Sequence, residues 1–77
     1  MKYLILSETK FNTNYVIFKI KIEDKNIKLH LNNLGFEEGQ KIQILKSNYF
    51  RKTFLVKVMG INYAVDKKII DNIIVYE

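Results

Sequence analysis

The spacing of the apolar residues changes at residue 24, and this change restricts the folds open to the chain. Within residues 15–23, alternation with period two predicts a half-buried strand whose inward side chains are Val16, Phe18, Ile20 and Ile22. Beyond Asp24, a suitable N-cap, the apolar positions fall at i, i+4 and i+7, at Ile27, Leu31 and Leu34. This spacing predicts a helix of about ten residues. The fold must therefore combine strands with one short helix.

Further short strands flank this pair, and one helical turn, capped by Asp66, is expected to run to about Asp71. The strands are expected at residues 3–6, 41–46, 54–59, 61–65 and 73–76. The order predicts a mainly β fold: a small barrel of about five to six short antiparallel strands, with one short α-helix inserted after the second strand. A barrel of this kind removes exposed sheet edges.

The chain has no proline and only three glycines, so each glycine is expected to serve a backbone requirement. Gly35 stands where a helix would end in a left-handed residue, and Phe36 can then fold back on the last turn. Gly39 supplies positive φ to a tight turn over residues 37–40. Gly60 reverses the chain between two strands. Positive φ is therefore predicted at Gly35 and Gly39.

Length and composition favour a binding or adaptor module over an enzyme. The 77 residues are expected to form one domain over residues 1–77. The absence of cysteine excludes a disulfide framework and a cysteine-based zinc site, and the single histidine excludes a multi-histidine centre within one chain. The N-terminal apolar run is too short for a signal peptide, and no window has the roughly 18–20 apolar residues of a membrane span. A cytoplasmic protein without membrane insertion is expected. Its oligomeric state stays open.

The formal net charge of +5 directs attention to nucleic acid, acidic partners or anionic membrane surfaces. The cations are scattered along the chain, and twelve of the thirteen are lysines, which is typical of a general compositional bias. Charge alone therefore leaves open whether the basic character is functional or compositional.

Residues 31–39, LNNLGFEEG, resemble the L-x-x-L-G-[LF]-x-x-G signature of the FeoA family. The resemblance continues through QKIQIL at 40–45, VKVMG at 56–60, YAV at 63–65 and IIV at 73–75. Two single positions and one three-residue segment depart from the family pattern. His30 and Asp66 stand where the family has arginine, and residues 51–53 (RKT) stand where it often has Gly-Asp-Pro.

The resemblance implies an SH3-like barrel and a non-enzymatic accessory role in bacterial ferrous iron transport. The partner it implies is the cytosolic part of a membrane ferrous iron permease of the FeoB type, and no cofactor is required. Two rival functions remain open. One is a small basic β-barrel that binds nucleic acid. The other is a metal-sensing accessory domain, because the same module occurs at the C-terminus of iron-dependent repressors.

The loop over residues 47–53 is the first candidate contact surface, because Tyr49, Phe50 and Arg51 combine aromatic area with a cation. Such aromatics could also stack on bases. The alternative is that Tyr49 and Phe50 pack over the mouth of the barrel.

The predicted helix offers a second candidate surface, around His30 and Asn33. His30, with Glu37 and Glu38, could also form a weak site for a divalent metal such as Fe²⁺, although a full site needs three or four ligands with supporting hydrogen bonds. The alternative is that His30 is an ordinary residue at the edge of the apolar stripe of the helix. No catalytic residue is predicted.

Overall fold

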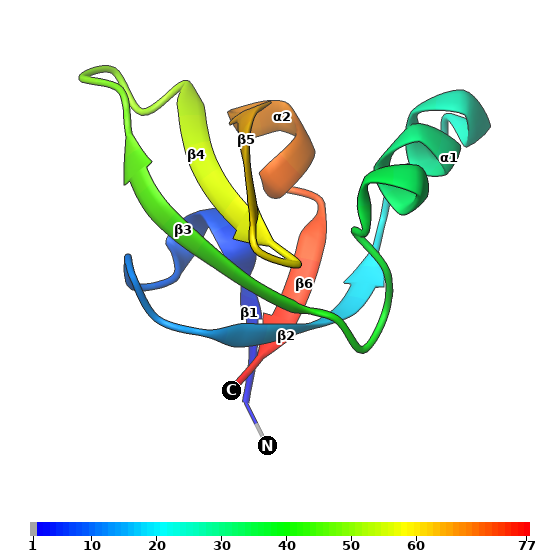
Figure 1. Cartoon of the computed structure of the whole chain (residues 1–77), viewed down its shortest axis with the longest axis horizontal. Helices are drawn as coiled ribbons and strands as arrows, with labels where there is room; N and C mark the ends of the chain where they lie inside the picture. The colour runs from blue at the N-terminus through cyan, green and yellow to red at the C-terminus, as the bar shows by residue number, and fades with distance from the viewer. Residues whose placement is uncertain (1) are drawn as a thin grey trace.

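The structure, a computed structural model, describes residues 2–77 and is mainly β (Figure 1). Its elements, in chain order, are β1 (Tyr3–Ile5), a 3₁₀ helix (Leu6–Glu8), β2 (Tyr15–Ile20), α1 (Lys25–Leu34), β3 (Lys41–Ser47), β4 (Thr53–Val58), β5 (Ile61–Asp66), α2 (Lys67–Ile70) and β6 (Ile73–Tyr76). The order matches the one expected from the sequence, except that the 3₁₀ helix follows the first strand directly.

The six strands form one antiparallel sheet in the order β1-β6-β2-β3-β4-β5. The sheet coils around a single core, and α1 stands to one side of it (Figure 1). Strands β1 and β5 are the two edges. The largest fully buried side chains are Phe36, Phe54, Leu6, Ile17, Ile42, Ile44, Ile70, Ile73, Val56, Val58 and Val75.

The first half of strand β2 buries the face opposite to the one that its alternation predicts. Tyr15 and Ile17 are 2% and 1% exposed, whereas Phe18 is 45% exposed. The register against β6 skips Phe18, so this residue forms a β-bulge. Because a bulge adds one residue, the inward positions are odd before it and even after it, and Ile20 is buried again. The prediction that Val16 and Phe18 point inward was therefore wrong.

Helix α1 begins and ends where the sequence predicts. The Asp24 side chain accepts hydrogen bonds from the backbone N–H groups of Asn26 and Ile27, at 2.9 and 3.2 Å. Gly35 has a φ of 105°. The Gly35 N–H donates to the Asn32 carbonyl, and the Phe36 N–H donates to the Leu31 carbonyl. This pair of bonds is a Schellman motif, and it turns the buried Phe36 into the core.

The C-terminal end of α1 also packs closely on the turn between β4 and β5. That turn contains only Met59 and Gly60, with φ of 53° and 78°, as a two-residue hairpin with right-handed twist requires. A Cβ atom added at Gly35 would lie 2.8 Å from the Met59 sulfur. The helix is thus held to the barrel at its last turn.

The remaining turns use the residues expected of them, with one exception. Gly39 has a φ of 89° within the turn from Glu37 to Gln40. Asp66 precedes α2, but its side chain makes no capping hydrogen bond, so that part of the prediction was wrong. Instead, Lys67 pairs with Asp71 at 2.8 Å. Hydrogen bonding to Lys67, supported by Ser7, lowers the pKa of the Asp71 carboxyl.

Candidate interaction surface

The loop between β3 and β4 projects its two aromatic side chains into solvent. Tyr49 is 92% exposed and Phe50 is 73% exposed, and their rings meet edge to face at 5.1 Å. The side-chain oxygen of Asn48 accepts hydrogen bonds from the backbone N–H groups of Lys52 and Thr53, which fixes the shape of the loop. The alternative in which these aromatics cover the barrel mouth was therefore wrong.

Arg51 belongs to the same loop but points toward the barrel. Its φ is 55°, and its guanidinium lies 5.4 Å from the Phe11 ring centroid and 5.3 Å from that of Phe54. Both distances suit cation–π contacts, which stabilise such pairs by about 0.5–2 kcal/mol each. Arg51 is therefore held by the barrel, while Tyr49 and Phe50 form an exposed tip, which we call the aromatic tip.

A hollow lies between α1 and the β5 edge of the sheet, and we call it the α1–β5 groove. Its volume is about 460 Å³. Helix α1 contributes Ile27, His30, Leu31 and Leu34, strand β5 contributes residues 63–66, and α2 contributes Ile69. Successive side chains of a strand point to opposite faces. Because four consecutive residues of β5 line the groove, it runs along the edge of that strand.

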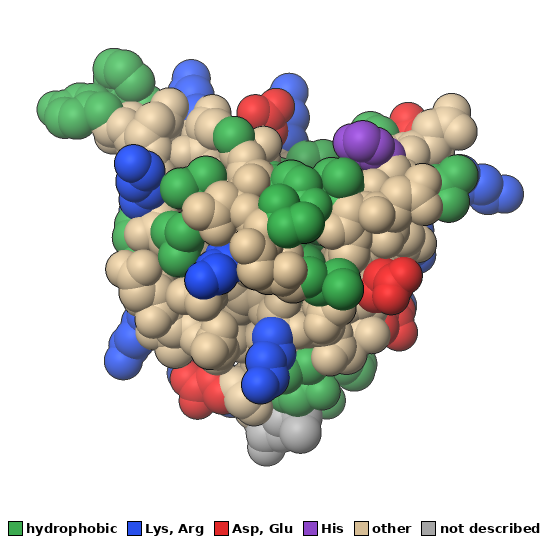
Figure 2. Space-filling model, viewed as in Figure 1, with side chains coloured by type: hydrophobic (Ala, Val, Ile, Leu, Met, Phe, Trp, Pro, Cys, Tyr) green, Lys and Arg blue, Asp and Glu red, His purple; other side chains and the backbone are tan. Residues whose placement is uncertain are grey.

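The groove continues past the last turn of α1 into a second hollow. Leu34 and Tyr63 line both, and Asn33, Met59 and Ile61 line only the second. The Tyr63 hydroxyl donates a 3.2 Å hydrogen bond to the Leu34 carbonyl, which ties β5 to the helix at this point. His30 therefore lies on the groove, while Asn33 lies at its continuation. In Figure 2 the imidazole is the purple side chain, and hydrophobic side chains lie beside it.

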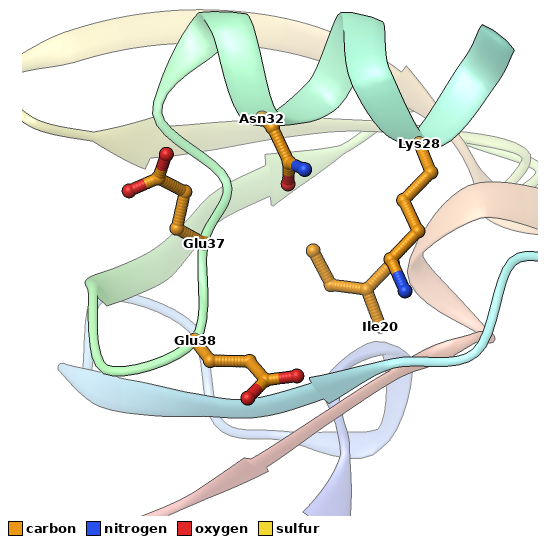
Figure 3. A pocket seen from close by; sticks show the side chains of 5 residues that line it. All are labelled: Ile20, Lys28, Asn32, Glu37 and Glu38. Atoms are coloured by element: carbon orange, nitrogen blue, oxygen red, sulfur yellow. The ribbon is translucent and has the colours of Figure 1, made fainter. Parts of the chain in front are cut away.

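The opposite side of α1 forms a smaller and more polar pocket of about 250 Å³ (Figure 3). Lys28 and Asn32 of the helix, Ile20 of β2, and Glu37 and Glu38 line it. The two carboxylates point in different directions in Figure 3.

This placement separates the three residues of the imagined metal site. His30 lines the α1–β5 groove and Glu38 lines the pocket across the helix, whereas Glu37 lines that pocket and the second hollow. Within residues 2–77 no group of three or more histidine, cysteine, aspartate or glutamate side chains is arranged to hold a metal ion. The proximity of these residues in sequence does not bring them together in space.

Sequence reasoning missed the β5 and α2 contributions to the groove. The sequence assigned three of these residues to a strand or a helical turn and to no surface: Tyr63, Ala64 and Ile69. The available signal was the absence of proline and lysine from residues 61–66, which is unusual for an edge strand. Its use requires knowledge that β5 lies at an edge.

The FeoA domain model matches residues 5–77, which is nearly the whole chain. The chain belongs to the FeoA family. A search of curated proteins found no match. A solved FeoA, described as an iron uptake regulatory protein, superposes with a TM-score of 0.81 at 22% identity, covering 99% of this chain and 97% of its own.

Two further solved structures extend this likeness. FeoA from Stenotrophomonas maltophilia, solved with zinc and described as a procaryotic SH3 domain protein, gives a TM-score of 0.79 at 21% identity, covering 94% of this chain and 88% of its own. A manganese-dependent transcriptional repressor gives 0.86 at 12% identity, covering 97% of this chain but 41% of its own. The fold of this FeoA chain is thus SH3-like.

The Stenotrophomonas maltophilia protein is described as a candidate ferrous iron transport activating factor. Within residues 2–77, neither helix has the length and apolar character needed to cross a membrane.

Proposed function

We propose that this FeoA protein is a non-enzymatic, cytoplasmic accessory protein of ferrous iron transport. It docks on the cytosolic part of a FeoB-type membrane permease, through the α1–β5 groove. No cofactor takes part in this role. Family membership supplies the link to iron transport. The groove supplies the surface, and it is the observation on which the docking proposal depends.

The groove has the character of a protein-binding site. Its lining is mostly apolar, and the exposed Ile27 stands on its helical wall. Apolar surface that is rimmed by polar groups and left open to solvent marks sites of association. His30 and Asp66 provide the polar groups on this rim. A partner side chain that enters the groove would remove both walls from water.

The aromatic tip is the second contact in this proposal. Exposed tyrosine and phenylalanine are costly to leave in water, and aromatic side chains are enriched in interface cores. The tip and α1 lie at opposite ends of the molecule in the view of Figure 1. A partner that contacts both would span β4 and β5. Arg51, held by Phe11 and Phe54, positions the tip in this scheme.

The groove is tested by two matched charge substitutions on α1. Ile27→Lys places an ammonium group on the groove wall, whereas Leu29→Lys places the same group on the same helix outside the groove. We expect Ile27→Lys to weaken binding to the purified cytosolic part of the permease at least tenfold, about 1.4 kcal/mol, and to slow iron uptake. Leu29→Lys should match wild type. Equal behaviour of the two variants would remove the groove from the docking proposal.

One observation favours nucleic acid as a second candidate partner. Tyr3, Tyr76, Val16 and Lys41 occupy one row across four strands of the sheet. Phe18 lies 4.5 Å from Tyr3 between ring centroids, so exposed aromatics gather on this outer face near lysine. Such platforms can stack bases. Binding of an oligouridine that falls steeply with salt and is lost in Phe18→Ala would favour this candidate over permease docking.

A further inference from the structure

The two edges of the sheet differ in how they are protected. Strand β1 has three residues and then turns into a 3₁₀ helix. Strand β5 has six residues in unbroken register with β4. Natural edge strands are usually blunted by lysine, proline, bulges or short length. Within residues 61–66 there is no lysine, proline or bulge, and the one charged side chain, Asp66, stands at the last position of the strand. Strand β5 is therefore an open edge.

The hairpin geometry determines which backbone groups of β5 face away from β4. A two-residue turn makes the flanking Val58 and Ile61 a hydrogen-bonded pair, and such pairs alternate along the ladder. Ile61, Tyr63 and Val65 therefore bond to β4. The N–H and C=O groups of Asn62 and Ala64 point outward, and no other backbone hydrogen bond engages residues 61–66.

These outward groups face the side on which the α1–β5 groove runs. The groove is lined by consecutive residues of β5, so it follows the strand edge, and its far wall is α1. A strand placed beside β5 would lie about 4.8 Å from it. Its side chains on the inner face would contact Leu31 and Leu34, and the alternate ones would face solvent.

We propose that the partner contributes an extended segment that adds to the sheet as a further strand along β5, with an apolar side chain at every second position. The proposal rests on the docking function proposed above and specifies its chemistry. Hydrogen bonds from the backbone of β5 supply affinity for any extended segment, whatever its side chains. The apolar wall of α1 selects segments that carry an apolar side chain at every second position.

The size of the groove favours a single segment over a second copy of this chain. Pairing of two β5 edges would bring the α1 helices of the two copies toward each other. A groove of about 460 Å³ holds a short extended segment, not a sheet with its helix. An extended peptide has no attached sheet or helix that would collide with α1.

The deciding variant is Ala64→Pro, with Ala64→Val as its control. Proline removes the outward N–H of residue 64 without removing a bond to β4, which is the edge position where proline is tolerated. Valine has a similar volume and keeps the N–H. We expect Ala64→Pro to bind the purified cytosolic part of the permease about tenfold or more weakly, and Ala64→Val to stay within about threefold of wild type.

A second measurement uses the wild-type chain. Amide hydrogen exchange at Asn62 and Ala64 should be fast in the free protein and should slow when the permease part, or a synthetic peptide from it, is added. This readout decides the question even if Ala64→Pro fails to fold. Unchanged exchange at both amides in the bound state would overturn strand addition.

The outcomes separate the two proposals. If Ile27→Lys loses binding while Ala64→Pro keeps it, docking in the groove stands and strand addition is wrong. If neither variant loses binding, the docking proposal is wrong, and strand addition, which depends on it, is wrong as well. Protection at Asn62 and Ala64 that grows with protein concentration, without any partner, would show pairing between copies and would also overturn the proposal.

Discussion

The paired strands β3 and β4 and the helix α1 have opposite relations to the core. The strands bury Ile42, Ile44, Val56 and Val58, each at most 1% exposed. Helix α1 has ten residues, and only Leu31 among them is buried. The difference shows that the strand pair supplies stability, whereas α1 mainly supplies surface. A domain of this size has little stability to spare, so ten residues of helix with one buried side chain call for a use outside the core.

The largest contrast is expected between Ile44→Ala in β3 and Leu29→Ala in α1. Ile44 is fully buried, so its truncation should lower the free energy of unfolding by about 2–5 kcal/mol. Leu29 is 59% exposed, so its truncation should change it by no more than about 0.5 kcal/mol. Urea denaturation of both variants measures the two values. Similar losses would mean that α1 contributes to the core as the strands do.

The junction between the two regions is tested by Gly35→Ala, with Gly39→Ala as its control. Both glycines have positive φ, which costs alanine about 1–2 kcal/mol. Only Gly35 faces a close neighbour, the Met59 sulfur, whereas the space around Gly39 is open. In thermal unfolding we expect about 1–2 kcal/mol for Gly39→Ala and up to about 1 kcal/mol more for Gly35→Ala, because the added Cβ must displace the flexible, exposed Met59 side chain. A larger loss at Gly39 would contradict the close packing of α1 on the β4–β5 turn.

The smallest effect is expected at the free end of α1. Asp24→Ala removes the N-cap and should cost about 1 kcal/mol, whereas the neighbouring carboxylate substitution Glu23→Ala should cost almost nothing. The loss should be local, so amide exchange should quicken in the first turn of α1 and stay unchanged in β3 and β4. Faster exchange throughout the barrel would show that the two regions unfold as one unit.

The sequence predicts the fold well where period and backbone chemistry agree. Asp24 bounds α1 because its side chain accepts hydrogen bonds from N–H groups of the first turn, and Gly35 bounds it because glycine readily adopts the positive φ that ends the helix. The first half of strand β2 was predicted with the wrong face because Val16, Ile17 and Phe18 are all apolar, so alternation alone does not reveal a bulge. Only the register against β6, a tertiary feature, places Phe18 outside.

The candidate surface was less predictable than the fold, because it depends on which elements become neighbours in the folded chain. Tyr49 and Phe50 were found from their chemistry, and their exposure needed the loop geometry. His30 was grouped with Glu37 and Glu38 by sequence proximity, yet within residues 2–77 these side chains form no cluster that could hold a metal ion. The wall formed by β5 could not be found at all, because edge position follows from the strand order and not from residues 61–66 themselves.

Helix α1 is attached to the barrel mainly at its C-terminal end, so a tilt about that end moves its first turn the most. The Gly35 turn and the bond from Tyr63 to Leu34 fix its last turn, and its first turn lies furthest from that support. Ten residues span about 15 Å, so a tilt of about 10° at the fixed end displaces the Asp24 end by roughly 2.6 Å. A tilt of α1 about its last turn would therefore change the width of the α1–β5 groove mainly near Ile27. Near Leu34 the bond from Tyr63 holds the helix and β5 at a fixed separation.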